Sequence, residues 1–412
     1  MIRSLLRYIK FFLFSLLIPK AGKVVWKDFV RYCLGQKTTH PLTINPWSEK
    51  TYSPEERDLS MGKAAEWLLH SQDSMIDAGF GSYHLINKWS SSYVETTGYI
   101  IPTLLEYGIL TNNADLVTKV IRSAEWLKSI QKESGGWQGE CINDNRPEIV
   151  FNTGQVVRGL ISIYKYNGDK SMLDSAIKAC NWLCAIQEEE GYWRKHAFRN
   201  VERVYDSYVD LPLLQMFEIT GNEIYKQKAL KNLYWIIEKK QHQNGWFDDC
   251  DNTIKNNDRP ILHTISYTID GLLDCGVLLN DSMLIEAARK SADKLFEIFN
   301  NKKYLKGRYD REWNGSEYLI PTGCAQIAIV WLKLYRRTGN AQYLNASLKI
   351  NDILIFIQDR LKREHPDTKG AIPGSYPVWG KYEPFSFPNW ATKFFIDSLY
   401  LEKICREEAL SE

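Results

Sequence analysis

The chain has little cysteine, no long apolar run and almost no net charge, and each shortage excludes a class of protein. Eight cysteines in 412 residues are too few for a disulfide scaffold, and they form no C-x-x-C pair of the kind that binds zinc. Cysteines scattered in this way favour a reducing compartment. The 52 basic and 50 acidic residues leave a formal charge of +2, so a general nucleic-acid binder is excluded. What is abundant is aromatic: 14 Trp and 23 Tyr in a globular chain of 412 residues. Such side chains fill cores and also form the flat faces that sugar rings prefer.

The basic residues are concentrated at the N-terminus. Residues 1–45 hold eight Lys or Arg against one acid, Asp28, and contain the apolar run 11–18, too short to span a bilayer. We expect a basic amphipathic helix lying on an anionic membrane surface. A helix packed on the domain and a secretion signal are the alternatives. The predicted organisation is an extension over 1–45 and one catalytic domain over 46–412, in a cytoplasmic protein peripheral on the inner membrane.

The chain contains an internal repeat with a period near 57 residues. A Trp or aliphatic residue is followed about five positions later by Gln or Asn, at Gln72, Gln131, Gln187, Gln241, Asn300 and Gln358. Each period holds two helical patterns. The first covers 57–72, 114–131, 171–187, 223–241, 281–300 and 341–360. The second covers 93–107, 152–166, 205–220, 263–275, 322–337 and 389–402.

The connections between these helices alternate in length. Second-to-first connections have about four to seven residues, whereas first-to-second connections have about 17 to 28 and hold most of the Gly, Pro, Trp and Arg. Loops of the longer kind are usually functional. Two-helix repeats closed into a ring place all long loops on one rim. We therefore predict an all-α (α/α)6 toroid with its cleft at that rim.

Two resemblances support this fold. The segments Gln131–Trp137, Gln187–Trp193 and Gln243–Trp246 resemble the Q-W repeat of the squalene and oxidosqualene cyclases, but the acid motif D-x-D-D is absent from the chain. From about 60 to 402 the chain resembles a bacterial family of (α/α)-toroid proteins of exopolysaccharide and surface-glycan biosynthesis. The segments that carry this likeness are 95–102, 151–156, 263–268 and 387–391. It implies a toroid related to six-hairpin glycosidases and a glycan context, without a defined reaction.

The polar residues that open the second helices are the candidate site, because those helices begin at one rim. Two mechanisms fit them. Glu95 and Asp206 are candidates for the acid and base of a glycosidase. His263 and Tyr267, four residues apart on one helical face, fit the proton transfers of a lyase or epimerase. The substrate-binding candidates are Tyr93, Asn152, Gln155, Tyr205, His196, Trp313, Gln326, Trp379, Asn389 and Trp390.

The loops between the helices suggest the ligand. Seven loop arginines and six inner helix N-termini favour an anionic sugar such as a uronate; the arginines are Arg146, Arg194, Arg199, Arg203, Arg259, Arg308 and Arg311. The segment 374–382 is predicted to form a lid or wall of the cleft, with a structural plug as the alternative. We expect no cofactor and no metal site, although Asp248, Asp249, Asp251 and Asp258 could hold a divalent cation.

The predicted function is that of a carbohydrate-active enzyme. We expect it to cleave or modify a bacterial exopolysaccharide or its lipid-linked precursor, by glycosidic hydrolysis or β-elimination. A sugar epimerase or glycosyltransferase is the enzymatic alternative, and a non-catalytic glycan-binding assembly protein is the alternative from another class.

Overall fold

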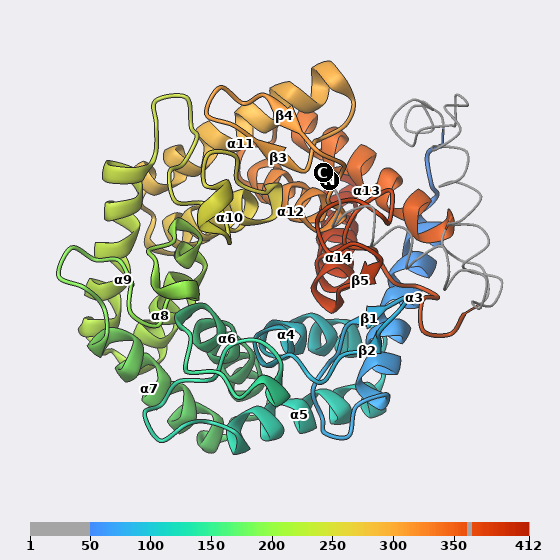
Figure 1. Ribbon diagram of the computed structural model, residues 1–412. Helices are drawn as coiled ribbons and strands as arrows, with labels where there is room; N and C mark the ends of the chain where they lie inside the picture. The colour runs from blue at the N-terminus through green and yellow to red at the C-terminus, as the bar shows by residue number, and fades with distance from the viewer. Residues whose placement is uncertain (1–49, 361–364, 412) are drawn as a thin grey trace.

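The structure is a computed structural model that describes residues 50–360 and 365–411. The expected N-terminal membrane helix therefore lies outside the described residues. The described chain is built from twelve α-helices in two concentric layers (Figure 1). The outer layer comprises α3 (Pro54–Asp73), α5 (Ala114–Ser129), α7 (Lys170–Ala185), α9 (Glu223–Trp235), α11 (Ser282–Lys302) and α13 (Ala341–Arg360). The inner layer comprises α4 (Val94–Leu110), α6 (Val150–Asn167), α8 (Ser207–Thr220), α10 (Leu262–Leu279), α12 (Pro321–Thr338) and α14 (Asn389–Ser411).

The helices close into a ring. Each inner helix packs against the next inner helix and against an outer helix, and α14 packs against both α3 and α4. Figure 1 shows the red C-terminal helices beside the blue N-terminal helix, with no break in the circle. The predicted (α/α)6 toroid is confirmed, and most helix boundaries fall within a few residues of those expected; α14 continues to Ser411 rather than 402, and α9 ends at Trp235 rather than 241.

Three of the five short turns from inner to outer helices share one local pattern. A glycine in the left-handed region ends the inner helix, as at Gly168 with φ 74° and Gly221 with φ 72°. An Asp or Asn then caps the outer helix: the side chain of Asp169 accepts from the Ser171 amide, and that of Asn222 from the Ile224 amide. The connections have only two or three residues, fewer than expected, because the helices continue to these caps.

The repeated Gln ties neighbouring repeats together. Gln131 Nε2 donates to the Ser175 carbonyl at 2.9 Å, and Gln187 Nε2 donates to the Lys228 carbonyl at 2.9 Å. In the last repeat, Gln358 Nε2 donates to the Ser60 carbonyl of α3 at 3.0 Å, which joins the two ends of the ring. The amide is the side chain that satisfies buried carbonyls at each junction. The repeat is thus a structural signature.

The Gly-x-Trp part of the repeat is also structural. Gly135 has φ 105°, and a Cβ there would lie 2.5 Å from the Lys178 carbonyl oxygen, so only glycine fits. Trp137 is fully buried, and its Nε1 donates to the Leu127 carbonyl at 2.7 Å. Trp193 repeats this arrangement on the Leu183 carbonyl at 2.9 Å.

Short strands join the long loops. β1 (Tyr83–His84) pairs antiparallel with β2 (Lys88–Trp89) and with β5 (Ser386–Phe387), with Tyr83 opposite Phe387. This small sheet links the first long loop to the last one. β3 (Arg308–Tyr309) pairs with β4 (Gly315–Ser316) in the loop before α12. Among the described residues, no helix is both long enough and apolar enough to cross a bilayer.

Candidate functional site

A cavity of about 440 Å³ lies where the long loops meet the N-terminal ends of the inner helices. Helices α4, α6, α10 and α14 contribute side chains from their first turns, and the loops between the helices close the sides. A concave site with aromatic walls and a few convergent polar groups is typical of small-ligand binding. The predicted location of the cleft, at the long-loop rim, is therefore where the structure has this cavity.

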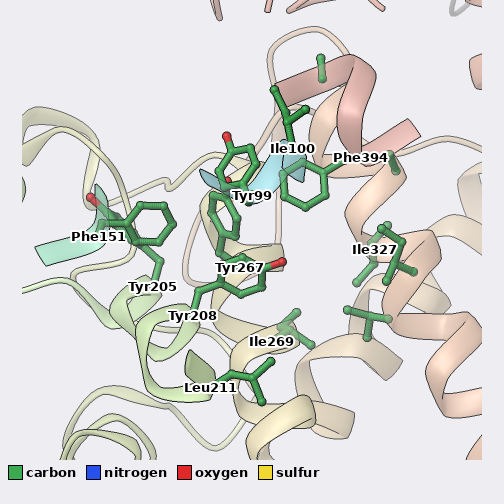
Figure 2. Packing of buried hydrophobic residues seen from close by; sticks show 14 of the residues in the cluster. Tyr99, Ile100, Phe151, Tyr205, Tyr208, Leu211, Tyr267, Ile269, Ile327 and Phe394 are labelled. Carbon is green, nitrogen blue, oxygen red and sulfur yellow. The ribbon is translucent and has the colours of Figure 1, made fainter. Parts of the chain in front are cut away.

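Aromatic side chains border the cavity on the side of the helical ring. Tyr267 lies at their centre, with ring centroids 5.0 Å from Phe151, 4.7 Å from Tyr208 and 5.6 Å from Phe394. Figure 2 shows these rings, together with Tyr99 and Tyr205, gathered between the inner helices. Their packing fills the space between the inner helices with apolar contacts beside the cavity.

Glu95 is the acidic group in the first turn of α4, and it faces the cavity. Removal of its carboxyl group from water, together with the nearby charge of Glu140, raises the pKa of Glu95 to about 8. With the Asn152 amide oriented to satisfy both neighbours, Nδ2 donates to Glu95 Oε2 and Oδ1 accepts from the Glu140 amide, each at 3.3 Å. Glu95 is therefore a carboxylic acid held in its protonated form at neutral pH.

Glu140 is the second carboxyl group of the cavity wall. It lies in the loop between α5 and α6, with its backbone in the left-handed region at φ 58°. Its Oε2 accepts from Arg146 Nε at 3.0 Å in a part-exposed ion pair. The backbone carbonyl of Glu140 accepts from the amide of Val94, which anchors this loop to the start of α4. The two acids are therefore held side by side, one protonated and one ion-paired.

His263 stands across the cavity on α10. Its Nδ1 is 2.6 Å from Gln326 Oε1 on α12, so Nδ1 carries the proton and Nε2 keeps its lone pair. Burial lowers the pKa of His263 to about 4, which keeps the ring neutral. The Tyr267 ring lies 4.5 Å away, centroid to centroid. Its hydroxyl makes no regular hydrogen bond within the described residues, and burial raises its pKa well above the ordinary value.

The last long loop forms one wall. Residues 374–380 are buried and none of them lines the cavity, which favours the structural plug over a lid; the residues that follow, from Tyr382 on, form the wall. Tyr382 and the half-buried Trp390 line the cavity, and Trp390 Nε1 donates to Tyr382 Oη at 3.0 Å. The Tyr93 ring meets Trp390 edge-on at a centroid distance of 5.8 Å. These rings give the wall aromatic faces with polar edges, the kind of surface on which a sugar ring stacks.

Half of the predicted site residues line this cavity: Glu95, His263, Tyr267, Tyr93, Asn152, Tyr205 and Trp390. Asp206 does not. It lies just before α8 and is 1% exposed, and neither carboxyl oxygen has a hydrogen-bond partner among the described residues. Burial raises its pKa to about 8, an effect that the Arg203 guanidinium partly opposes. The expected pairing of Glu95 with Asp206 is replaced in the cavity by Glu95 with Glu140.

The other predicted binding residues have structural surroundings. Gln326 supports His263, Gln155 Oε1 accepts from Arg158 Nε at 3.3 Å, and Asn389 Nδ2 donates to the Phe80 carbonyl at 3.0 Å.

The remaining three lie in long loops. His196 Nδ1 is 3.0 Å from the Glu148 carbonyl oxygen, and its ring meets Trp182 edge-on. Trp313 Nε1 donates to the Asn244 carbonyl at 3.1 Å, and Trp379 is buried within the segment 374–380. None of them is among the residues that line the cavity.

Several lining residues were not predicted, among them Glu140, Trp89, Tyr99, Phe151 and Glu383. Glu140 follows the repeated Gly-Gly-Trp turn, and its place in a long loop was the only sequence signal available. Tyr99 lies one turn further along α4 than Glu95, on the same helical face. This i, i+4 spacing could have identified it.

The acidic loop residues considered for a cation have other partners. Asp251 Oδ2 accepts from Arg308 Nη1 at 2.7 Å, and Asp249 Oδ2 accepts from Lys240 Nζ at 2.6 Å. Asp248 faces His242 at 2.8 Å, and Asp258 pairs with Arg259 at 3.0 Å. Over the part of the chain that the structure describes, no group of three or more His, Cys, Asp and Glu is placed to hold a metal ion.

The comparisons with known proteins agree with this architecture. No protein-family model matches the chain. A stretch of 146 residues is 25% identical to squalene–hopene cyclase of Zymomonas mobilis, but it covers 34% of this chain and only 20% of that protein. The fold is similar to that of an unsaturated glucuronyl hydrolase specific for heparin, at a TM-score of 0.66 and 14% identity over 86% of this chain and 99% of the other. A sugar epimerase from a ruminal bacterium also has a TM-score of 0.66, with 13% identity over 84% of this chain and 98% of the other. The chain thus has the fold of (α/α)6 toroid enzymes that act on carbohydrates.

Proposed function

We propose that this protein is a glycoside hydrolase whose active site is the cavity that contains Glu95 and Glu140. The observation that carries this proposal is the pair itself. Glu95 is protonated at neutral pH because its pKa is about 8, while Glu140 is ion-paired with Arg146. Glycoside hydrolases use one protonated carboxyl group as the acid and one carboxylate as the base, and an aromatic cavity binds the sugar.

The roles follow from the protonation states. Glu95 donates its proton to the glycosidic oxygen as the bond to the anomeric carbon breaks. A water oxygen attacks the anomeric carbon, and the Glu140 carboxylate takes the proton of that water. Asn152 contacts both residues and fixes their relative position. His263 accepts a hydrogen bond from a sugar hydroxyl through Nε2, and Trp390 with Tyr382 stacks on the sugar ring.

The proposed substrate is an oligosaccharide from a bacterial exopolysaccharide or its lipid-linked precursor. Support comes from the likeness of the chain to toroid proteins of surface-glycan biosynthesis and from the carbohydrate enzymes that share its fold. The cavity of about 440 Å³ has the size expected for one or two sugar units.

An epimerase or lyase is the second candidate, favoured by the geometry of His263. Its lone pair at Nε2 and the nearby Tyr267 hydroxyl form a base and an acid on one helical face. The pKa of His263, about 4, argues against an epimerase or lyase, because a weak base removes a proton from carbon slowly.

The test is a panel of defined oligosaccharides incubated with the wild-type protein, Glu95→Gln and Asp206→Asn. Hydrolysis is expected to release reducing ends without an unsaturated product, and only Glu95→Gln should abolish it. Absorbance of an unsaturated uronate would indicate a lyase, and deuterium exchange into intact substrate would indicate an epimerase. Saturable binding of the panel without any conversion would leave the protein as a glycan-binding assembly component and would contradict the proposal.

A further inference from the structure

The cavity is poor in available positive charge, although its loops are rich in arginine. The described residues that line it include three acids, Glu95, Glu140 and Glu383, but only one lysine, Lys88, beside the histidines His84 and His263. Lys88 is exposed at the start of β2, with Nζ 3.4 Å from Tyr83 Oη. Over the described residues, no arginine lines the cavity.

Four of the seven loop arginines are ion-paired with acidic side chains, and none of the seven is among the residues that line the cavity. Arg146 pairs with Glu140, and Arg194 with Glu202 at 3.2 Å. Arg308 pairs with the Asp251 carboxylate at 2.7 Å. Arg203 Nη1 donates to the Asp251 carbonyl at 2.6 Å, and its Nε and Nη2 are buried without a hydrogen-bond partner among the described residues, but Arg203 does not line the cavity. The partners of the other three are Asp258 for Arg259, His242 for Arg311 and the Phe198 ring for Arg199. Releasing any of the ion-paired side chains for a ligand would leave its present partner uncompensated.

The first amides of the inner helices are also occupied. The Val94 amide of α4 donates to the Glu140 carbonyl at 3.3 Å, and the Leu262 amide of α10 donates to the Gly307 carbonyl at 2.9 Å. The Val150 amide of α6 donates to the His196 carbonyl at 2.8 Å. Helix N-termini attract anions chiefly through such free N–H groups. At α4, α6 and α10 a neighbouring loop therefore takes one of these N–H groups.

His263 adds to this character, because it presents a lone pair rather than a proton at Nε2. An anionic group placed beside it would face the acceptors of His263 and Glu140 with no arginine to balance them. A buried charge without a partner is strongly disfavoured. Sugar hydroxyls, in contrast, can donate to these acceptors and accept from the tyrosine hydroxyls.

We infer that the inner part of the cavity selects an uncharged sugar unit and rejects a uronate or a phosphorylated sugar. This inference rests on the proposed function only in placing a sugar in the cavity. It differs from the expectation of an anionic substrate, which was based on loop arginines that do not line the cavity.

The experiment measures binding, by isothermal titration, to the Glu95→Gln protein so that turnover does not intervene. Three methyl glycosides of the same ring and anomer are compared in the gluco and galacto series: the hexoside, the uronoside and the uronamide. The uronamide matches the uronate in size but carries no charge. We expect the hexoside and the uronamide to bind at least about tenfold more tightly than the uronate.

Two further variants test whether the charge of the cavity wall causes the difference in affinity between uronate and uronamide. Glu140→Gln removes a negative charge from the wall and is expected to narrow the difference between uronate and uronamide. Arg194→Gln, a loop arginine outside the cavity wall, is the matched control and should leave that difference unchanged.

Three outcomes would overturn the inference: uronate binding equal to or tighter than uronamide, exclusion of both C6 derivatives alike, or no binding in either series. The proposed function fails separately. Hydrolysis of a uronoside by the wild-type protein would refute the charge selection and keep the hydrolase, whereas selective binding of neutral sugars without hydrolysis would do the reverse.

Discussion

Glu95 and Asp206 lie at corresponding places in two repeats, at the beginnings of the inner helices α4 and α8. Burial raises the pKa of each to about 8. Yet Glu95 faces the cavity beside Glu140 and Asn152, whereas Asp206 is enclosed by protein and does not line it. A raised pKa reports burial in both cases. Only the geometry around Glu95 turns that shift into a proton donor that a substrate can reach.

The largest expected effect separates these two carboxyl groups by activity. Glu95→Gln should lower kcat/KM by about 10²–10⁴-fold, because general acid catalysis contributes about that much. Asp206→Asn should keep kcat/KM close to the wild-type value. Steady-state kinetics on the best oligosaccharide of the panel provide the measurement. Equal losses in the two variants would place Asp206 in the reaction and contradict the comparison.

The pH dependence of activity sharpens the role of Glu95. Because the protonated form of Glu95 is the proposed proton donor, kcat/KM should fall as the pH rises through its pKa of about 8. Arg146→Met leaves the Glu140 charge unbalanced and should therefore move this alkaline limb to higher pH.

Arg194→Met is the control for that shift, because its partner, Glu202, is not among the residues that line the cavity. It should leave the limb in place. If kcat/KM falls at the same pH in Arg146→Met as in the wild-type protein, the titrating group is not Glu95.

The pH dependence of the free energy of unfolding tests the buried state of Asp206. Between the ordinary pKa of 3.8 and about 8, the folded state keeps a proton on Asp206 that the unfolded state has lost. The free energy of unfolding therefore falls as the pH rises through this window. Asp206→Asn should reduce the slope and raise the free energy of unfolding near pH 8, because the neutral amide has no proton to take up on folding.

Urea titrations at several pH values measure this change. Glu125→Gln, an exposed carboxyl on α5, is the control and should leave the slope as it is. A wild-type slope that persists in Asp206→Asn would show that another buried group is responsible.

The smallest expected effect concerns the support of His263. Gln326→Leu removes the acceptor of the Nδ1 proton and should lower kcat/KM by no more than about tenfold, since one such hydrogen bond contributes about 1 kcal/mol. Gln326→Glu restores an acceptor and adds a charge, so it should raise the pKa of His263, which ¹⁵N NMR of the ring nitrogens can follow. An unchanged pKa in Gln326→Glu would mean that the two side chains are not in contact in solution.

The fold could be predicted from the sequence because the signals that determine it lie within each repeat. The period, the Gln that bonds to the next outer helix, and the Gly-Asp and Gly-Asn turns act within one repeat or between neighbours. Ring closure followed from the number of repeats and from the alternation of loop lengths.

The site was predicted less well, for a physical reason. A position in the first turn of a helix determines roughly the direction in which a side chain points. It does not determine which neighbouring residues pack over that side chain. Asp206 and Gln155 satisfy the same sequence criterion as Glu95 and His263, yet packing between neighbouring inner helices encloses them. Glu140 was missed because it is positioned by a loop whose path depends on contacts with α4.

The pairing of β1 with β5 has a consequence for biosynthesis. The wall of the cavity joins Tyr83 to Phe387, so the two ends of the described chain must meet before a binding site exists. During synthesis every earlier repeat can fold on its predecessor, but the pocket can form only after the final helix has left the ribosome. Prematurely terminated chains should therefore lack glycan-processing activity, however well their first hairpins fold.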